Sequence, residues 1–383
     1  MPGKSICARL KLSSTMHTND AEQIWQEYVD RELAVIAHVL TELGFELEVE
    51  QPHLFGERYL MRAVTTVSGR KLILLGHRRE DGKRVVIKAT SDAGGIRELE
   101  HERTCRAVLQ RINFAYQTFL SPEEILFTKR GPYTLSIQAF IEQERPFLGR
   151  PLEEQFALAL SAFKAQEGAH ATTYGHERII RNTFGARDAA GYLAAFRQFQ
   201  KEILKRIPDE ALRALLEKSV ELLEASREII EQYGGFLTHT DFVPHNFRVV
   251  GHDIYLLDYS SLRFGNKYEG WARFLNFMAL YNPPLQQALM DYVRLNRTPE
   301  ESLALKLMRI YRLGEIISYY ANIIEKCSGN LRILNQERVR FWTHVLAAVL
   351  DDRQPAPAVL EEYKKKRDQL RSAEEKRRQK DLH

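Results

Sequence analysis

The chain has 383 residues, of which 44% are hydrophobic and 28% charged, a globular composition that excludes disorder or fibrous structure for most of its length. The net charge of +4 is small for this length and excludes the strongly basic surface of a dedicated nucleic-acid-binding domain. Residues 361–383 hold nine basic and six acidic side chains, so most of the positive excess lies in this tail.

The cysteines and apolar stretches bear on the compartment. Cys7, Cys105 and Cys327 lie far apart without a C-x-x-C pair, which excludes a disulfide framework and a cysteine zinc site. The longest apolar stretches, residues 33–40 and 345–350, fall short of the roughly 18 to 20 residues that span a bilayer. We predict a cytoplasmic protein with no membrane partner.

The first half predicts an antiparallel sheet that contains one helix. Residues 20–43 have apolar side chains three and four positions apart, which indicates an amphipathic helix that packs on the next domain. Residues 96–111 have the same period, with Leu99, Glu102, Cys105 and Leu109 on one face. Short apolar runs rich in β-branched residues predict strands at residues 60–67, 71–75, 84–89 and 135–141.

The second half is helical apart from one short island. A helical period is present in residues 152–168, 188–206, 209–232, 284–295, 299–326 and 334–350. The island has three short apolar strands, at residues 236–239, 247–250 and 254–258. These patterns predict an α+β protein with two lobes and a cleft between them.

We divide the chain into four parts. They are an N-terminal helical extension (1–57), an N-lobe with the predicted sheet (58–142), a helical C-lobe with the island of short strands (143–357) and a charged tail (358–383). The tail lacks an apolar stripe, so we expect it to be solvated and its removal to leave the fold intact. No nucleic-acid partner is expected, and only a weak contact through the basic residues 364–380 stays open.

The polar residues that bear most on function lie in the island. Asp241 and Asn246 follow its first strand, and Asp258 ends its third. This order gathers two carboxylates and one amide at one end of a small sheet. Phosphoryl transfer needs such a set, because one carboxylate accepts the proton of the attacking hydroxyl while the other oxygen ligands hold Mg²⁺ against the phosphates.

The pattern His239-x-Asp241-x-x-x-x-Asn246, with Asp258 twelve residues later, resembles the loops of the aminoglycoside phosphotransferase and choline kinase group. The resemblance implies a two-lobed protein-kinase-like fold, with one helix in an antiparallel N-lobe sheet and a small catalytic hairpin in a larger helical C-lobe. It implies that Asp241 is the catalytic base, that Asn246 and Asp258 bind Mg²⁺, and that His239 supports the loop through hydrogen bonds.

The N-lobe supplies further parts of the resemblance. Val85-Val86-Ile87-Lys88 is similar to the strand that carries the phosphate-binding lysine. Glu102 is the predicted partner of Lys88, with Glu98 as the alternative. The backbone of Ser68 and Gly69 would cover the nucleotide phosphates or form a plain hairpin turn. Backbone groups near Ala139 and Ile141 would bond adenine.

The sequence also departs from the family. Members commonly show Gly-Asp-x-x-x-Asp-Leu-Ala after the metal-binding Asp. Here Gly265-Asn266 begins this segment and Gly270-Trp271-Ala272 ends it, so the aspartate that braces the loop is missing. Thr240 and His245 replace glycines of the family motif, and Thr240 stands where protein kinases have Arg.

These observations predict a kinase that transfers the γ-phosphoryl group of ATP, with Mg²⁺, to a hydroxyl of a small-molecule acceptor. Two alternatives stay open: a pseudokinase that binds nucleotide without turnover, and a hydrolase with zinc on His239, His245 and Asp241. The aromatic residues of the late helices either line an acceptor pocket or belong to the core; they are Tyr311, Tyr319, Tyr320 and Trp342.

Overall fold

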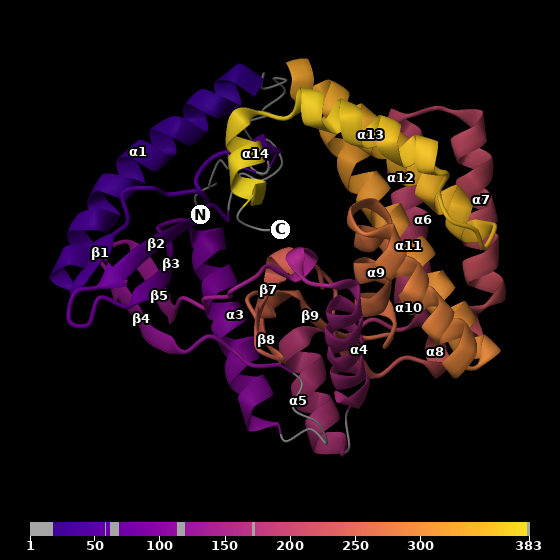
Figure 1. Cartoon of the computed structure of the whole chain (residues 1–383), viewed down its shortest axis with the longest axis horizontal. Helices are drawn as coiled ribbons and strands as arrows, with labels where there is room; N and C mark the ends of the chain where they lie inside the picture. Colours follow the sequence, from indigo (N-terminus) through magenta and orange to yellow (C-terminus); the bar gives the residue numbers. More distant parts are fainter. Residues whose placement is uncertain (1–17, 58, 62–68, 113–118, 171–172, 381–383) are drawn as a thin grey trace, which may run out of the picture.

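Two lobes make up the structure, a computed structural model that describes residues 18–57, 59–61, 69–112, 119–170 and 173–380. The first lobe is an antiparallel sheet with helices on it, and the second is mainly helical (Figure 1). The predicted α+β, two-lobed class is therefore confirmed.

The N-lobe sheet has the strand order β1-β2-β3-β5-β4, with every neighbouring pair antiparallel. Its strands are β1 (Phe45–Leu47), β2 (Leu72–Arg78), β3 (Arg84–Thr90), β4 (Glu124–Arg130) and β5 (Tyr133–Ala139). Side chains alternate between the two faces of a strand, so Val85, Ile87 and Ala89 enter the lobe core while Val86 and Lys88 face the other way.

Helix α1 (Thr18–Glu42) covers one face of this sheet, as the sequence predicted (Figure 1). Trp25, Ile36 and Leu40 are buried in one cluster with the core-facing strand residues. Trp25 Nε1 also donates to the carbonyl of Leu54, 2.7 Å away, which fixes the chain between β1 and β2. Helix α3 (Ala93–Arg111) agrees with the predicted helix and begins at Asp92, whose carboxylate accepts from Gly94 N and Gly95 N.

Two N-lobe predictions were wrong or incomplete. A strand was predicted at residues 60–67, but residues 59–61 are helical, so the start of this prediction is wrong. Residues 62–68 lie outside the described part. Strands β1 and β4 were not predicted. β1 has three residues only, and β4 is an edge strand whose side chains are half-buried or exposed, so its sequence has no clear alternation.

The C-lobe packs its helices around two small two-stranded sheets. The helices are α4 (Leu152–Gly168), α5 (Tyr174–Phe184), α6 (Ala189–Arg206), α7 (Glu210–Ala225), α8 (Arg227–Gln232), α9 (Glu269–Tyr281), α10 (Pro283–Asn296), α11 (Pro299–Ile324) and α12 (Gly329–Leu350). Strand β6 (Phe236–His239) pairs with β9 (Leu262–Gly265), and β7 (Phe247–Val250) pairs with β8 (Asp253–Leu256). The predicted hairpin is therefore confirmed.

Helices α5 and α9 and strand β9 were not predicted. α9 is buried on nearly all sides, with Trp271 stacked on Phe163 at a ring-centroid distance of 3.9 Å, so it lacks the polar stripe that makes a helix recognisable. The segment predicted as one helix at residues 209–232 is two helices, α7 and α8, which meet at Ser226.

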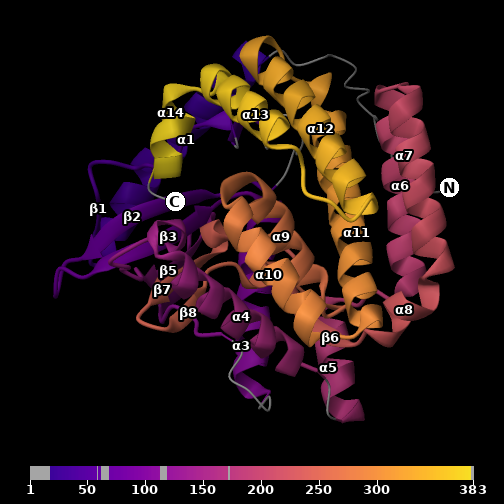
Figure 2. The same cartoon turned by 45° about the vertical axis from the view of Figure 1, so that its right-hand side comes forward.

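The charged tail is docked, which corrects the expectation that it is solvated. Helix α13 (Pro357–Leu370) lies along α12, and α14 (Ala373–Lys380) lies near α1 and the N-lobe (Figures 1 and 2). The buried Tyr363 stacks on Phe341, and Ser372 N donates to Glu57 Oε1 over 2.6 Å. One aromatic and one aliphatic side chain, Tyr363 and Leu360, are buried and anchor a helix that is otherwise mostly charged. Among the described residues, no helix has both the length and the apolar character to span a membrane.

Candidate active site

A cavity of about 580 Å³ lies between the lobes. From the N-lobe, Val86, Lys88 and Glu102 line it, and the strand end at Ala139 closes one side. The C-lobe contributes residues that flank the β7–β8 hairpin to the same cavity, namely His245, Asn246, Leu257, Asp258 and Ser260. Lys88, Glu102, Asn246 and Asp258 of the predicted site thus line one cavity, whereas Asp241 and His239 are not among its lining residues.

Lys88 and Glu102 form a buried ion pair at the N-lobe wall. Lys88 Nζ lies 2.5 Å from Glu102 Oε1 and 3.3 Å from the carbonyl of Leu257. Both side chains are nearly inaccessible, at 11% and 4% exposed. Glu98, the alternative partner, pairs instead with Lys71 at 3.1 Å. A buried ammonium held by one carboxylate is positioned to meet anionic groups that enter the cavity.

Asp241 lies at the C-terminal end of β6, where its side chain is 40% exposed. Its Oδ1 accepts from Arg273 Nε at 2.7 Å, and its Oδ2 accepts from Asn246 Nδ2 at 2.8 Å. Burial alone would raise the pKa of this carboxyl, but the charges of Arg273 and Arg312 outweigh burial and lower the pKa. Asp241 is therefore ionised at neutral pH, as an acceptor of a hydroxyl proton must be.

Asp258 and Asn246 provide oxygen atoms on the C-lobe wall. Asp258 Oδ1 accepts from Ser260 N and Oγ, and Oδ2 accepts from Ser261 Oγ. Burial raises its pKa, but these hydrogen bonds and nearby positive charge, including that of Lys88, outweigh burial and lower the pKa, so Asp258 is a carboxylate. Carboxylate and amide oxygens that line one cavity wall are the hard donors that Mg²⁺ prefers, so these residues fit that ion.

His239 is fully buried below the loop. Its Nε2 lies 2.6 Å from the carbonyl oxygen of Asp258, which can only accept, so Nε2 carries the proton. Burial lowers the pKa of the ring and keeps it neutral. His239 therefore links the strand that leads to Asp241 with the segment that carries Asp258.

The brace that the missing aspartate would supply comes from another helix. Gln166 Oε1, on α4, accepts from His239 N and from Thr238 Oγ1, each at 3.1 Å. Thr238 Oγ1 in turn accepts from Gly270 N at 3.0 Å. A Cβ atom on Gly270 would lie 2.4 Å from Gln166 Oε1, so glycine at this position leaves room for the glutamine. The start of α9 and the segment that leads to Asp241 are held together in this way.

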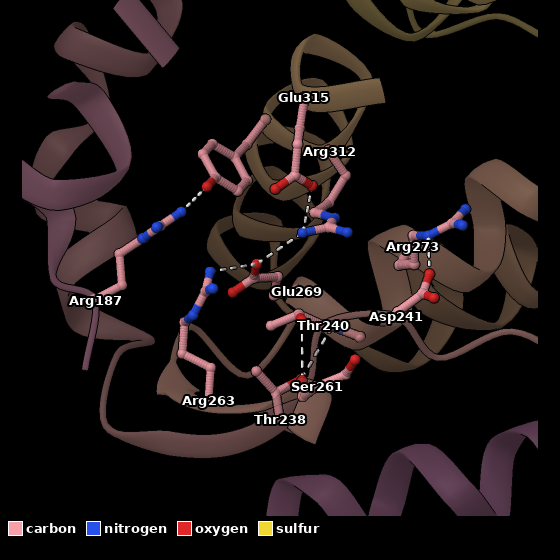
Figure 3. A network of polar contacts seen from close by, with 12 residues as sticks. Arg187, Thr238, Thr240, Asp241, Ser261, Arg263, Glu269, Arg273, Arg312 and Glu315 are labelled. Carbon is pink, nitrogen blue, oxygen red and sulfur yellow. Dashed lines mark hydrogen bonds and ion pairs between the residues drawn. The ribbon is translucent and has the colours of Figure 1, made fainter. Parts of the chain in front are cut away.

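An arginine cluster lies around the segment that leads from β6 to Asp241, with Arg273 next to Asp241 and Arg187 on the opposite side (Figure 3). It consists of Arg187, Arg263, Arg273 and Arg312. The fully buried Glu269 lies among them, 3.4 Å from Arg312 Nη1 and 3.8 Å from Arg263 Nη1. Its other oxygen accepts from Tyr192 OH at 2.6 Å.

The residues predicted to contact the nucleotide through their backbone are Ser68, Gly69, Ala139 and Ile141. Gly69, with φ of +94°, donates its N–H to the carboxylate of Asp92, and Ser68 lies outside the described residues. Ala139 N donates to the carbonyl of Glu123 at 2.9 Å, so this amide is already used. Ala139 and Ile141 both line the cavity.

The alternatives based on zinc and on aromatic residues receive little support. No three His, Cys, Asp or Glu side chains come together as a metal cluster in the described ranges. His239 is bonded to the Asp258 carbonyl, whereas the ring of His245 lies edge-on to Phe277. Tyr311 and Trp342 are buried in the C-lobe core, and Tyr319 is 44% exposed.

Sequence reasoning missed Gln166, Arg273 and the arginine cluster. Gln166 did leave a signal, since it stands on the same helix face as the buried Ala159, Ala162 and Phe163, where an apolar residue is expected. Arg273 left none, because its contact with Asp241 joins two segments distant in the chain.

No protein-family model matches the sequence, and no curated protein matches it significantly. Several solved structures do match. A macrolide 2'-phosphotransferase type I is 12% identical, with a TM-score of 0.52 over 81% of this chain and 97% of that chain. The GDP and kanamycin complex of APH(2")-IIia is 13% identical, with a TM-score of 0.52 over 74% and 90%.

A third match is a thermostable mutant of aminoglycoside phosphotransferase APH(4)-Ia in ternary complex with AMP-PNP and hygromycin B. It is 13% identical, with a TM-score of 0.50 over 75% of this chain and 92% of that chain. These identities are low and the similarity is one of architecture. The chain therefore has the kinase-like fold of the aminoglycoside and macrolide phosphotransferases.

Proposed function

We propose that the protein is a phosphotransferase that moves the γ-phosphoryl group of ATP to a hydroxyl of a small molecule. The observation that carries this proposal is the convergence of Lys88 and Glu102 from one lobe with Asn246 and Asp258 from the other on one cavity. Asp241 stands beside them through its hydrogen bond with Asn246. A pseudokinase has no chemical need for this complete set.

Lys88 binds the α and β phosphates, and Glu102 keeps its ammonium in place. Asn246 and Asp258 hold Mg²⁺, which neutralises charge on the phosphates when bound. The backbone of Ile141 is our choice for the adenine contact, because the amides of Ala139 and Phe140 already donate to the carbonyls of Glu123 and Arg84.

Asp241 is the group that receives the proton of the acceptor hydroxyl. Its lowered pKa keeps it ionised, and Arg273 and Asn246 fix the orientation of its carboxylate. Phosphoryl transfer depends mainly on positioning and on charge compensation, so a weak but oriented base suffices. The acceptors named for the similar structures, hygromycin B and kanamycin, are small molecules, and we assign the same broad class here.

Nucleotide binding tests the proposal directly. Magnesium with AMP-PNP or a nonhydrolysable GTP analogue is titrated calorimetrically into wild type, Lys88→Met and Lys129→Met. Lys129 is an exposed lysine of β4 and serves as the matched control. Loss of the lysine at the phosphates should reduce turnover by about 10²-fold, with weaker nucleotide binding, while the control behaves as wild type. Wild type that binds neither purine nucleotide would exclude the proposed function.

A further inference from the structure

The arginine cluster has more positive charge than its carboxylates balance. Arg273 is paired with Asp241, and Arg312 with Glu315 at 2.5 Å and with Glu269. Among the residues that the structure describes, the one carboxylate near Arg263 is Glu269, at 3.8 Å. Arg187 bonds to the hydroxyl of Tyr311, and in the described part of the chain it has no carboxylate within ion-pair distance. Burial and the charge of Arg263 both lower the pKa of Arg187, so these two cations are close together.

Some donors of the cluster are buried without a hydrogen-bond partner among the described residues. They are Arg312 Nε and Arg263 Nη1. The Arg312 side chain is nine-tenths buried. Buried guanidinium donors that lack acceptors are costly, and a bound anion would supply the acceptors.

The cluster is preorganised and lies next to the reacting position. Glu269 contacts both Arg263 and Arg312, and its other carboxylate oxygen accepts a hydrogen bond from Tyr192 OH. Strand pairing places Arg263 opposite Thr238, three residues before Asp241, and Arg273 contacts the Asp241 carboxylate directly (Figure 3). Arg263 and Arg273 are 29% and 20% exposed, so part of the positive surface is accessible.

From this geometry we infer that the acceptor is anionic, a small hydroxyl compound whose carboxylate or phosphate group binds Arg187, Arg263 and Arg312 while its hydroxyl faces Asp241. The inference rests on the proposed function. Guanidinium groups match the planar or branched oxygens of carboxylate and phosphate. A positively charged acceptor would meet like charges on the same surface and bind poorly.

The test compares acceptors that differ in charge. Glycerol, glycerate and glycerol 3-phosphate form one series, and glucose, gluconate and glucose 6-phosphate form a second; kanamycin is the cationic compound. Each is titrated calorimetrically, with and without saturating magnesium and a nonhydrolysable ATP analogue. The analogue occupies the γ-phosphate position, so that the probe's anion cannot bind there. Turnover with ATP is then measured for each compound that binds.

Arg263→Gln and Arg187→Gln are the variants, and Arg197→Gln is the control, because Arg197 is an arginine of α6 that is 61% exposed. We expect an anionic member to bind wild type more tightly than its neutral counterpart. Each variant should weaken anion binding about 10- to 100-fold, the loss expected for a charged hydrogen bond. The Arg197→Gln control should leave anion binding unchanged.

The inference is overturned if no anion binds, if neutral compounds or kanamycin bind as tightly as the anions, or if the variants bind anions like wild type. Failure of the proposed function has a separate signature, namely no binding of the magnesium-bound ATP analogue. Because the arginine variants are also titrated with anions in the absence of the analogue, their effect on anion binding tests the inference in either case.

Discussion

Replacing Gln166 tests whether this residue braces the catalytic loop. Gln166→Leu removes the oxygen that accepts hydrogen bonds from His239 N and Thr238 Oγ1. Both donors are fully buried, so water cannot take its place. An unpaired buried donor costs about 1–3 kcal/mol. Leucine also removes Gln166 Nε2, which has no partner among the described residues, and this offsets part of the loss. We expect a net loss of about 2 kcal/mol in the free energy of unfolding.

Loss of these hydrogen bonds should also lower turnover, because His239 stands two residues before Asp241. We expect turnover to fall by about tenfold or more, while the affinity for magnesium-bound nucleotide changes little. Gln166→Glu keeps an acceptor oxygen for both donors, so its turnover should fall less than that of Gln166→Leu, while burial of the added carboxyl group lowers its stability as well. Urea unfolding, nucleotide titration and turnover measure these effects. Equal losses of turnover in both variants, or no loss in Gln166→Leu, would refute the proposed role of Gln166 as a brace.

A double-mutant cycle with Gly270→Ala adds a second check. The new Cβ would lie 2.4 Å from Gln166 Oε1 and 2.9 Å from Thr238 Oγ1, so alanine is destabilising in the wild-type background. After Gln166→Ala the first clash is gone, and Gly270→Ala should cost less. A coupling energy of about 0.5–3 kcal/mol is typical for residues in contact, and additive effects would show that the two positions do not touch.

Three further predictions follow from the site and the tail. Asp241→Ala should keep the affinity for magnesium-bound nucleotide within a few fold and lower turnover by about 10²-fold. Asp258→Ala should weaken nucleotide binding in the presence of magnesium only. Both affinities are measured calorimetrically, and an equal loss in the two variants would contradict the assignment of Asp241 as the base. The pKa of Asp241 is lowered, so its carboxylate stays ionised throughout the ordinary titration range of an aspartate and is protonated only as pH falls through the lowered pKa. Arg273→Gln should raise that pKa and move the acidic limb of the pH–turnover profile toward neutral pH, and an unmoved limb would contradict this. Deletion of residues 372–383 leaves the buried carboxylate of Glu57 without its bond from Ser372 N and should cost about 1–3 kcal/mol in urea unfolding; unchanged stability would show that the contact is unimportant.

The local periodicity of the sequence was sufficient to predict a feature wherever that feature depends on a single strand, helix or hairpin. The alternation of β3 puts Lys88 on the face opposite to Ile87, and the helical period of α3 puts Glu102 among its buried residues. The hairpin of β7 and β8 followed from two apolar runs and a tight turn. These are short-range properties, and a single sequence contains them.

Elements that depend on tertiary contacts could not be predicted in this way. Strand β9 has four residues and exists because β6 pairs with it. The tail has one of the most charged sequences in the chain, yet the Tyr363 ring on Phe341 is sufficient to dock α13. In both cases the deciding contact joins residues far apart in the sequence, so no local pattern signals it.

The brace of the catalytic loop is the clearest example of this limit. Glycine at position 270 stands where the family has an aspartate, and from the sequence alone the role of that residue is simply missing. In the structure an oxygen from α4 occupies the space beside Gly270, and the N–H of His239 donates to it. The physical requirement is a buried acceptor for that N–H, and any segment that reaches the same place can meet it. A substitution at a family position therefore removes the role of the original residue only where no neighbouring segment supplies a replacement.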